Sequence, residues 1–482
     1  MTSSRSVTRT EVDTGSATGW KKYDKYPIEV DRLQDDKATE ILLCNFERPH
    51  MRAFHCSWFA FFVAFFVWFS ITPLIPEIQK SLGLSNEEIW TSNIANVTGT
   101  IFMRVLLGPL CDKVGPRILF AVVLGVSAIP AACIGFVHTT TGLTIIRSFI
   151  GLAGGTFVMC QYWTSSMFTK EIVATANGLV AGWGNLGAGV TQLLVGTLLF
   201  PLFKEIFKGT DNPTENAWRT VCIFPAVLAV ITGVFIYKLS DDTPKGNFNE
   251  LKKNGSMGDP SAIQSFRKGF YNINTWILLI QYGCCFGVEL TMNSAAAAYF
   301  HDTYRLTTDE SAAIASIFGW MNLFARGLGG WISDILNMKW GMRGRLYAQL
   351  VLLILEGGLV LIFANSNSLI ESINIMVFFS MFVQAAEGST YGIVPYVDPD
   401  ALGAVTGIVG AGGNLGAVAF GMAFRDQEID ERKAFFIMGC SILASAVTTI
   451  FITIDGHRCI LFGKDSVETQ TQKRNNLTNI RQ

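Results

Sequence analysis

The chain has 482 residues, of which 50% are hydrophobic and only 16% are charged, and its formal net charge at pH 7 is -1. This composition is too apolar for a soluble protein of this length, and the near-neutral charge excludes a basic surface for nucleic acid. The ten cysteines have neither disulfide-type nor metal-type spacing, and without a nucleophile-base pair or phosphate loop we expect no enzyme and no cofactor or metal.

Twelve apolar stretches are long enough to cross a bilayer as helices. Each is much longer than the roughly ten alternating residues of a membrane β-strand, so the predicted fold class is an all-α polytopic membrane protein. The expected spans, in chain order, are 55–76, 91–111, 116–137, 142–166, 176–201, 218–238, 271–293, 311–334, 346–365, 372–396, 401–424 and 434–455.

A polar stretch divides these spans six and six. It is rich in Asp, Lys, Gly, Asn and Ser, and we expect a flexible linker there. Lysine and arginine concentrate in the loops on the side of this linker, so both chain ends should be cytoplasmic. The predicted parts are an N-terminal tail (1–54), a six-helix bundle (55–238), the central loop (239–270), a second six-helix bundle (271–455) and a C-terminal tail (456–482).

Arg104 lies well inside the second span, and Arg326 lies inside the eighth, 222 positions later. An arginine in hydrocarbon costs several kcal/mol and cannot shed its proton, so it usually marks an ion or substrate path. Each is followed at the same spacing by a glycine and an aspartate: Gly108 and Asp112, and Gly330 and Asp334. Two buried arginines at matching places predict a site between two related halves.

A second repeat consists of glycine-rich stretches around an asparagine. Asn185 in the fifth span and Asn414 in the eleventh both precede the letters L-G-A. Glycines in spans admit a neighbouring helix closely, and helix packing explains most of them. The asparagines add amide donors to otherwise apolar helices, and we expect Asn185, and by the same pattern Asn414, to reach the substrate.

The stretch from Gly108 to Arg117 resembles the loop signature between the second and third helices of the major facilitator superfamily. With the paired arginines and glycine-asparagine stretches, the chain is similar to the nitrate/nitrite porter family within it. Cys160 to Trp163 and the long central loop lean toward its eukaryotic high-affinity nitrate transporters. The resemblance covers about 55–455 and implies the major facilitator fold with twelve transmembrane helices. The second loop signature departs from the family pattern at Leu336 to Lys339.

This resemblance implies a site for nitrate between the two bundles. Arg104 and Arg326 would clamp the anion, with Tyr282 from the seventh span and Phe157 from the fourth; Phe286 follows Tyr282 by one helical turn. The planar fork of a guanidinium suits planar nitrate better than a lysine ammonium does.

Glu289 and Glu387 are acids inside spans, which makes them candidates for proton coupling; packed and paired glutamates are the alternative. Arg147 begins the fourth span, and it either takes part in proton coupling, as such an arginine does in many proton-driven superfamily members, or snorkels to the interface. The predicted gating residues, which hold helices in one conformation rather than bind substrate, are Asp112, Arg117 and Asp334.

We therefore predict a plasma-membrane importer of nitrate, and also of nitrite, by proton symport through alternating access. Its partners are nitrate, nitrite, protons and the lipid bilayer, and the plant relatives often need a small accessory membrane protein. Moving one anion into a negative interior costs about 2.3 kcal/mol per 100 mV, so voltage-driven uptake needs more than one proton per anion. The alternatives are a nitrate/nitrite antiporter and a nitrate-sensing receptor.

Overall fold

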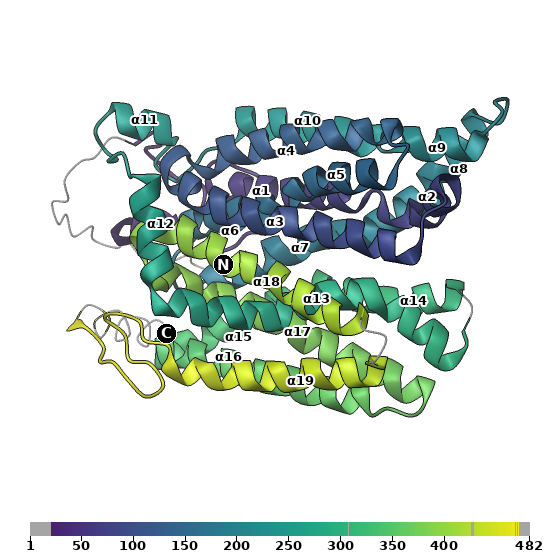
Figure 1. Ribbon diagram of the computed structural model, residues 1–482. Coiled ribbons are helices and arrows are strands. Elements are labelled where there is room, and N and C mark those ends of the chain that lie inside the picture. Colours follow the sequence, from purple (N-terminus) through teal and green to yellow (C-terminus); the bar gives the residue numbers. More distant parts are fainter. Residues whose placement is uncertain (1–20, 307, 426–428, 468, 470, 472–482) are drawn as a thin grey trace, which may run out of the picture.

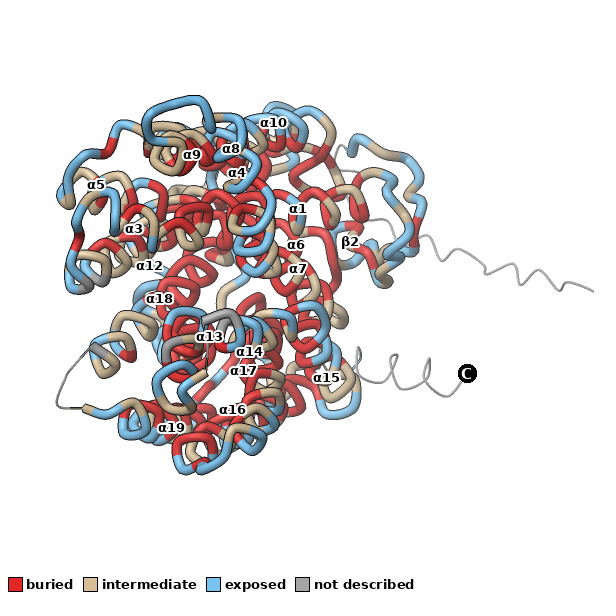
Figure 2. The backbone as a smooth tube through the Cα atoms, turned by 90° about the vertical axis from the view of Figure 1, so that its right-hand side faces the viewer, coloured by how far each residue is buried: buried red, intermediate tan, exposed pale blue. Residues whose placement is uncertain are grey.

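The computed structural model describes residues 21–306, 308–425, 429–467, 469 and 471, so the outer parts of both predicted tails, 1–20 and 472–482, lie outside it. Two bundles of roughly parallel helices lie side by side, one from each half of the chain (Figure 1). Buried residues line the inner faces of these helices, and exposed residues lie at the periphery (Figure 2). Many exposed side chains are large and apolar, such as Phe102 at 73% and Ile129 at 64%, as expected for faces that contact lipid.

The N-terminal bundle begins with an irregular first span and ends at Leu239. Short 3-10 or π segments join several of its helices, for example Gly151–Gly155 and Leu194–Leu199. Its helices are α1 (His50–Phe69), α2 (Ile75–Leu82), α3 (Asn86–Val114), α4 (Pro116–Ala132), α5 (Thr140–Ile150), α6 (Thr156–Met167), α7 (Val173–Leu193), α8 (Phe200–Ile206), α9 (Pro213–Val221) and α10 (Ile223–Leu239).

The C-terminal bundle repeats this arrangement with fewer interruptions. Its helices are α13 (Ile273–Tyr304), α14 (Thr308–Trp320), α15 (Ala325–Trp340), α16 (Met342–Ala364), α17 (Leu369–Val397), α18 (Leu402–Arg425) and α19 (Glu431–Val447).

The predicted eighth span, 311–334, is not one continuous helix. Within the described residues, eleven helices are long and apolar enough to cross a membrane; the eighth crossing is divided between α14 and α15 by a 3-10 turn, Met321–Leu323. One backbone carbonyl at this break, that of Leu323, accepts a hydrogen bond from the indole of Trp183 at 3.1 Å. The break places Arg326 in the first turn of α15, facing the other bundle.

The central segment, 239–270, is folded, so the expectation of a flexible linker is wrong. It contains α11 (Phe248–Lys253) and α12 (Ala262–Tyr271), and Ser265 on α12 donates a hydrogen bond to the carboxylate of Asp112. Composition suggested a solvated loop, but contacts with both bundles fix this segment in place.

The described part of the N-terminal tail packs on the same end of the N-terminal bundle. It forms a small antiparallel ladder between β1 (Val30–Asp31) and β2 (Lys37–Ala38). Asp241, which is fully buried, is paired there with Lys22 at 2.8 Å and with Arg48 at 3.5 Å. A buried carboxylate needs such partners, so the tail and the central segment stabilise each other.

The two bundles meet where helices cross at glycines. A Cβ atom on Gly407 of α18 would lie 2.3 Å from the carbonyl oxygen of Arg104 on α3. On the other side, a Cβ on Gly178 of α7 would lie 2.5 Å from the carbonyl oxygen of Arg326 on α15. Only glycine permits so close an approach of two helix backbones. This close packing holds the turns that carry the two arginines against the opposite bundle.

Candidate functional site

Arg104 is fully buried at the interface between the bundles. Its Nη1 donates to the carbonyl of Gly410 on α18 at 2.6 Å, and its Nε donates to the carbonyl of Gly154 at 3.1 Å. Its Nη2 is buried and has no hydrogen-bond partner among the described residues. An unpaired buried guanidinium nitrogen is costly, and this one is available for an anion.

Arg326 is 1% exposed and lies in a more acidic setting. Its Nη2 donates to the hydroxyl of Tyr282 at 2.7 Å. Its Nη1 forms an ion pair with Glu387 and lies 3.9 Å from the carboxylate of Glu289. The Nη1 contact with Glu387 is a close charge pair without the alignment of a hydrogen bond. A carboxylate therefore pairs with this arginine.

Aromatic rings connect the two arginines. The guanidinium carbon of Arg104 lies 4.7 Å from the ring centre of Phe157 and 5.1 Å from that of Phe286. The guanidinium carbon of Arg326 lies 5.7 and 5.8 Å from the same two rings. The ring of Tyr282 stacks on Phe286 with centroids 5.4 Å apart. Both cations thus share one aromatic wall, which favours them electrostatically without neutralising them.

The two predicted asparagines have different surroundings. With its amide oxygen turned toward Arg104, Asn414 accepts from Nη1 and Nε of that arginine at 3.3 Å each. Asn185 instead donates to Glu289 at 3.3 Å, and Asn322 donates to the same oxygen at 2.9 Å. Asn414 therefore belongs to the arginine cluster, whereas Asn185 holds the acid beside it.

Three glutamates are buried in the C-terminal bundle. Glu387 and Glu289 were predicted from the sequence, and both lie next to Arg326. Glu356 on α16 was missed; it is 0% exposed and neither of its carboxyl oxygens has a hydrogen-bond partner among the described residues. A single acid in the apolar span 346–365 was the available signal.

Tyr391 is a second residue that the sequence did not indicate. Its ring meets those of Phe157 and Tyr282 edge to face, with centroids 5.0 and 5.1 Å apart, and its hydroxyl donates to the carbonyl of Thr406 at 3.2 Å. It therefore belongs to the same aromatic cluster. Its position after the polar run Gly388 to Thr390 could have suggested this.

Arg147 does not join this cluster. It is 4% exposed, so it does not snorkel to an interface, and its Nη1 donates to the hydroxyl of Ser92 within the N-terminal bundle at 2.7 Å.

Two of the three predicted gating residues contact the opposite bundle. Asp112 on α3 accepts from the backbone nitrogens of Gly403, at 2.9 Å, and Ala404, at 3.3 Å. Asp334 on α15 accepts from the backbone nitrogen of Thr175 at 2.7 Å.

The third predicted gating residue, Arg117, remains within its own half. It donates to the carbonyl of Tyr237 and lies 3.7 Å from the carboxylate of Asp242. It therefore supports the folded central segment, and among the described residues it forms no hydrogen bond across the bundles.

This geometry can be compared with known proteins. Residues 57–421 match the family described as Major Facilitator Superfamily. The chain is 38% identical over 430 residues to "High affinity nitrate transporter 2.5" of Arabidopsis thaliana, covering 89% of this chain and 84% of that protein. It is 36% identical over 444 residues to "High-affinity nitrate transporter 2.3" of Oryza sativa subsp. japonica, covering 92% and 84%. The chain belongs to the high-affinity nitrate transporter family of the major facilitator superfamily.

More distant members of this family and superfamily are also similar. "Nitrate/nitrite transporter NrtP" of Nostoc punctiforme is 28% identical, with 83% of this chain and 91% of that protein covered. Among solved structures, the proton:xylose symporter XylE has a TM-score of 0.61 at 14% identity, covering 82% of this chain and 94% of that one. The human organic anion transporter MFSD10 has a TM-score of 0.60 at 12% identity, covering 84% and 100%. At these identities the structures support the fold alone, and they confirm the predicted twelve-helix class.

Proposed function

We propose that this protein imports nitrate, which binds between the two bundles at Arg104 and Arg326. The observation that carries the proposal is the buried Nη2 of Arg104, which has no hydrogen-bond partner among the described residues and lies beside the same two rings that the second arginine faces. The relatives named as nitrate transporters support the choice of anion.

The chemistry of the cluster suits a small planar anion. Guanidinium groups present coplanar donors that match oxygen atoms in one plane. The hydroxyl of Tyr282 accepts a hydrogen bond from Arg326, and the amide oxygen of Asn414 accepts from Arg104. Nitrite has the same charge and a planar shape, so the site should accept it as well, as the name of the relative NrtP suggests for that protein.

The ion pair between Arg326 and Glu387 can couple nitrate binding to proton binding. Nitrate must displace the carboxylate of Glu387 to bind this arginine. Protonation of Glu387 removes its charge and releases the guanidinium, so proton binding and nitrate binding favour each other. Glu289, 3.9 Å from the same nitrogen, extends this coupling, and the amides of Asn185 and Asn322 keep it in place.

Charge counting favours symport with two protons. With both carboxylates ionised and no anion, the two arginines are balanced and the site is neutral. With both carboxyls protonated and one nitrate bound, the site carries one positive charge. Inward movement of that charge is driven by a negative interior by about 2.3 kcal/mol per 100 mV. An exchange of nitrate for nitrite would need no such acids.

The wider setting follows from the same proposal. We place the protein in the plasma membrane with both chain ends cytoplasmic, because the basic loops lie on the side of the central segment. The bundles 55–238 and 271–455 rock about the arginine pair, and Asp112 and Asp334 hold them together at the cytoplasmic end. Arg147 keeps a supporting part in proton coupling through α5. A small accessory membrane protein is a further candidate partner.

Current recording in a voltage-clamped expressing cell tests the transport mode. Symport predicts an inward current on addition of nitrate that grows as the outside is acidified. Labelled nitrate uptake without current would instead establish electroneutral exchange, and saturable binding without uptake would establish a receptor.

A further inference from the structure

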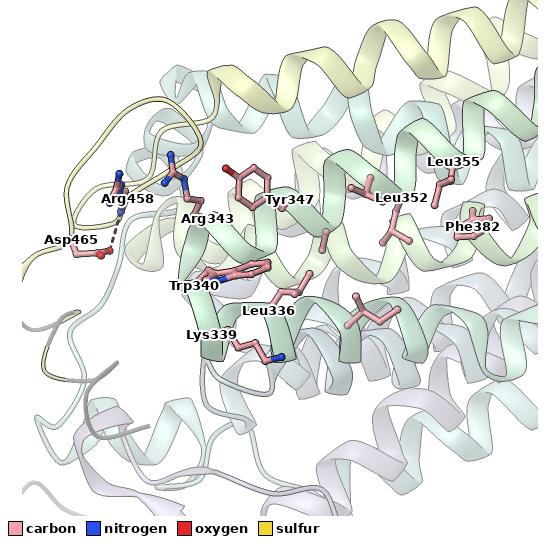
Figure 3. A pocket seen from close by; sticks show the side chains of 13 residues that line it. Leu336, Lys339, Trp340, Arg343, Tyr347, Leu352, Leu355, Phe382, Arg458 and Asp465 are labelled. Carbon is pink, nitrogen blue, oxygen red and sulfur yellow. Dashed lines mark hydrogen bonds between the residues drawn. The ribbon is translucent and has the colours of Figure 1, made fainter. Parts of the chain in front are cut away.

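A pocket of about 750 Å³ lies on the C-terminal bundle, away from the arginine pair. It lies between α15 and α16, with Phe382 of α17 at one end and the segment after α19 at the other (Figure 3). It shares no lining residue with the nitrate site. Some of its wall is open to the surroundings, since Val351 is 51% exposed and Trp340 is 53% exposed. The pocket therefore faces the membrane rather than the transport path.

One part of the pocket is apolar and follows the direction of the helices. Val351 and Leu355 lie one turn apart on α16, Leu352 lies between them, and Leu336 comes from α15. In Figure 3, Leu352 and Leu355 lie between the charged end of the pocket and Phe382. Within a membrane, such a slot is continuous with the hydrocarbon layer and has the shape of a site for an extended chain.

The other part of the pocket is basic. Lys339, Arg343 and Arg458 line it, with Asp465 as the one acid. Asp465 accepts a hydrogen bond from the backbone nitrogen of Arg458 at 3.1 Å. Arg343 donates through Nη2 to the carbonyl of Ile460 at 2.6 Å, but its buried Nε has no partner among the described residues. Three cations against one carboxylate leave an excess of positive charge at this end.

Aromatic and apolar side chains mark the boundary between the two parts. The rings of Trp340 and Tyr347 meet edge to face, with centroids 6.3 Å apart, and such residues are enriched where a bilayer meets water. On the segment after α19, Leu461 is 64% exposed and Phe462 is 52% exposed. Exposed apolar residues beside a basic pocket are typical of a segment that lies on the membrane surface.

We propose that this pocket binds one anionic phospholipid from the leaflet on the side of the central segment. Arg343, Lys339 and Arg458 hold its phosphate group, and one acyl chain lies along Val351 and Leu355. A basic pocket between transmembrane helices at this level suits anionic headgroups. The basic end suits a phosphate group and the apolar slot suits an acyl chain, so a phospholipid fills both parts of the pocket. A free phosphate would occupy only the basic end.

Native mass spectrometry of the purified full-length protein tests this site. Phosphatidylglycerol and phosphatidylcholine with identical chains are added at equal concentrations. The wild type should retain phosphatidylglycerol preferentially. The double substitution Arg343→Gln/Arg458→Gln should lower the bound fraction about fivefold per arginine. Val351→Trp should also lower it, because the larger ring fills the apolar slot.

The matched control is Lys253→Gln, an exposed lysine on α11 at the same end of the molecule, which should leave lipid binding unchanged. Excess inorganic phosphate should not displace the lipid. If Arg343→Gln lowers the melting temperature, Lys339→Gln and Val351→Trp, both at exposed positions, carry the test. Equal retention of the two lipids, binding unaffected by these substitutions, or displacement by inorganic phosphate would each overturn the proposal.

Discussion

Asp112 and Asp334 make the same contact from opposite halves of the molecule. Asp112, on α3, accepts from the first backbone nitrogens of α18, and Asp334, on α15, accepts from those of α7. In each case a carboxylate of one bundle caps a helix of the other, where the helix dipole favours a negative charge. The repeat in the sequence is thus also a repeat in how the bundles are held together at this end.

Removing either cap should loosen this end of the molecule. Hydrogen bonds to a charged group contribute about 1.5–3 kcal/mol, so Asp112→Asn and Asp334→Asn should shift the population toward a state open at this end. Spin labels on the exposed residues Lys113 and Lys339 would report this as longer distances between the bundles. Asp400→Asn is the control, because Asp400 is exposed and pairs only at the surface with Lys268. Unchanged distances in both cap variants would exclude a gating role.

Replacement of either arginine by lysine tests the anion clamp. Lysine keeps the charge but loses the planar fork, so Arg104→Lys and Arg326→Lys should each raise the KM for nitrate. The loss of one charge-assisted hydrogen bond corresponds to about 10- to 100-fold. Labelled nitrate uptake, normalised to surface expression, measures the effect. Arg432→Lys is the control, because Arg432 donates a hydrogen bond to Asn367 at the surface; this variant should leave uptake unchanged. Wild-type KM in a clamp variant would remove that arginine from the site.

The sequence singled out most of the residues that the structure groups around the two arginines. Arg104 and Arg326 were visible because a charge in an apolar span is costly and because the pattern repeats. Tyr282, Phe157 and Phe286 came from the resemblance, and the structure brings them to the arginines. The fold class followed from span lengths, since only helices satisfy backbone groups over such runs.

The contacts between distant segments could not be predicted in this way. The carbonyl of Gly410, which binds Arg104, lies 306 positions away, and its direction depends on how α18 is rotated. The central segment looked solvated because its composition is polar, yet Asp241 is paired with Lys22, 219 positions earlier. Local pattern predicts which residues are unusual; packing decides what they contact.

Glycine at the bundle crossing should be indispensable. A Cβ on Gly330 would lie 2.1 Å from the carbonyl oxygen of Ala174, a backbone atom that cannot move without shifting α7. Overpacking of this kind costs about 1–3 kcal/mol, so Gly330→Ala should reduce the nitrate uptake rate severalfold at normal expression. A Cβ on Gly358 of the neighbouring helix α16 would meet no atom within 4 Å, so Gly358→Ala should leave the uptake rate unchanged. Equal uptake by the two variants would contradict the close crossing.

The stability of the folded central segment should depend on pH through Asp242. Burial raises the pKa of this carboxyl from 3.8 to about 6, and the charge of Arg117 opposes the rise. A raised pKa in the folded state means that Asp242 contributes stability below its ordinary pKa and loses that contribution as the pH rises through about 6.

Asp242→Asn should therefore weaken the gain in melting temperature when the purified protein is acidified from about pH 7.5 to about pH 5. Asp259→Asn is the control, because this exposed acid pairs with Lys252 and its pKa is lowered rather than raised. If the wild type and Asp242→Asn gain equally on acidification, the burial of Asp242 does not control stability in this range.

Glu387→Gln separates anion binding from proton coupling. Glutamine cannot compete for Arg326 as a carboxylate does, so nitrate binding should become stronger at neutral pH and should depend less on pH, with the remaining dependence coming from Glu289. The same change removes one of the two groups that take up protons, so one proton at most accompanies each nitrate; the inward current on addition of nitrate should disappear while exchange of labelled nitrate between the two sides persists. Glu371→Gln, an exposed acid at the start of α17, should leave both measurements unchanged. A pH-dependent nitrate current in Glu387→Gln would show that Glu387 is not one of the two proton carriers, and Glu356, whose carboxyl has no hydrogen-bond partner among the described residues, would be the next residue to replace.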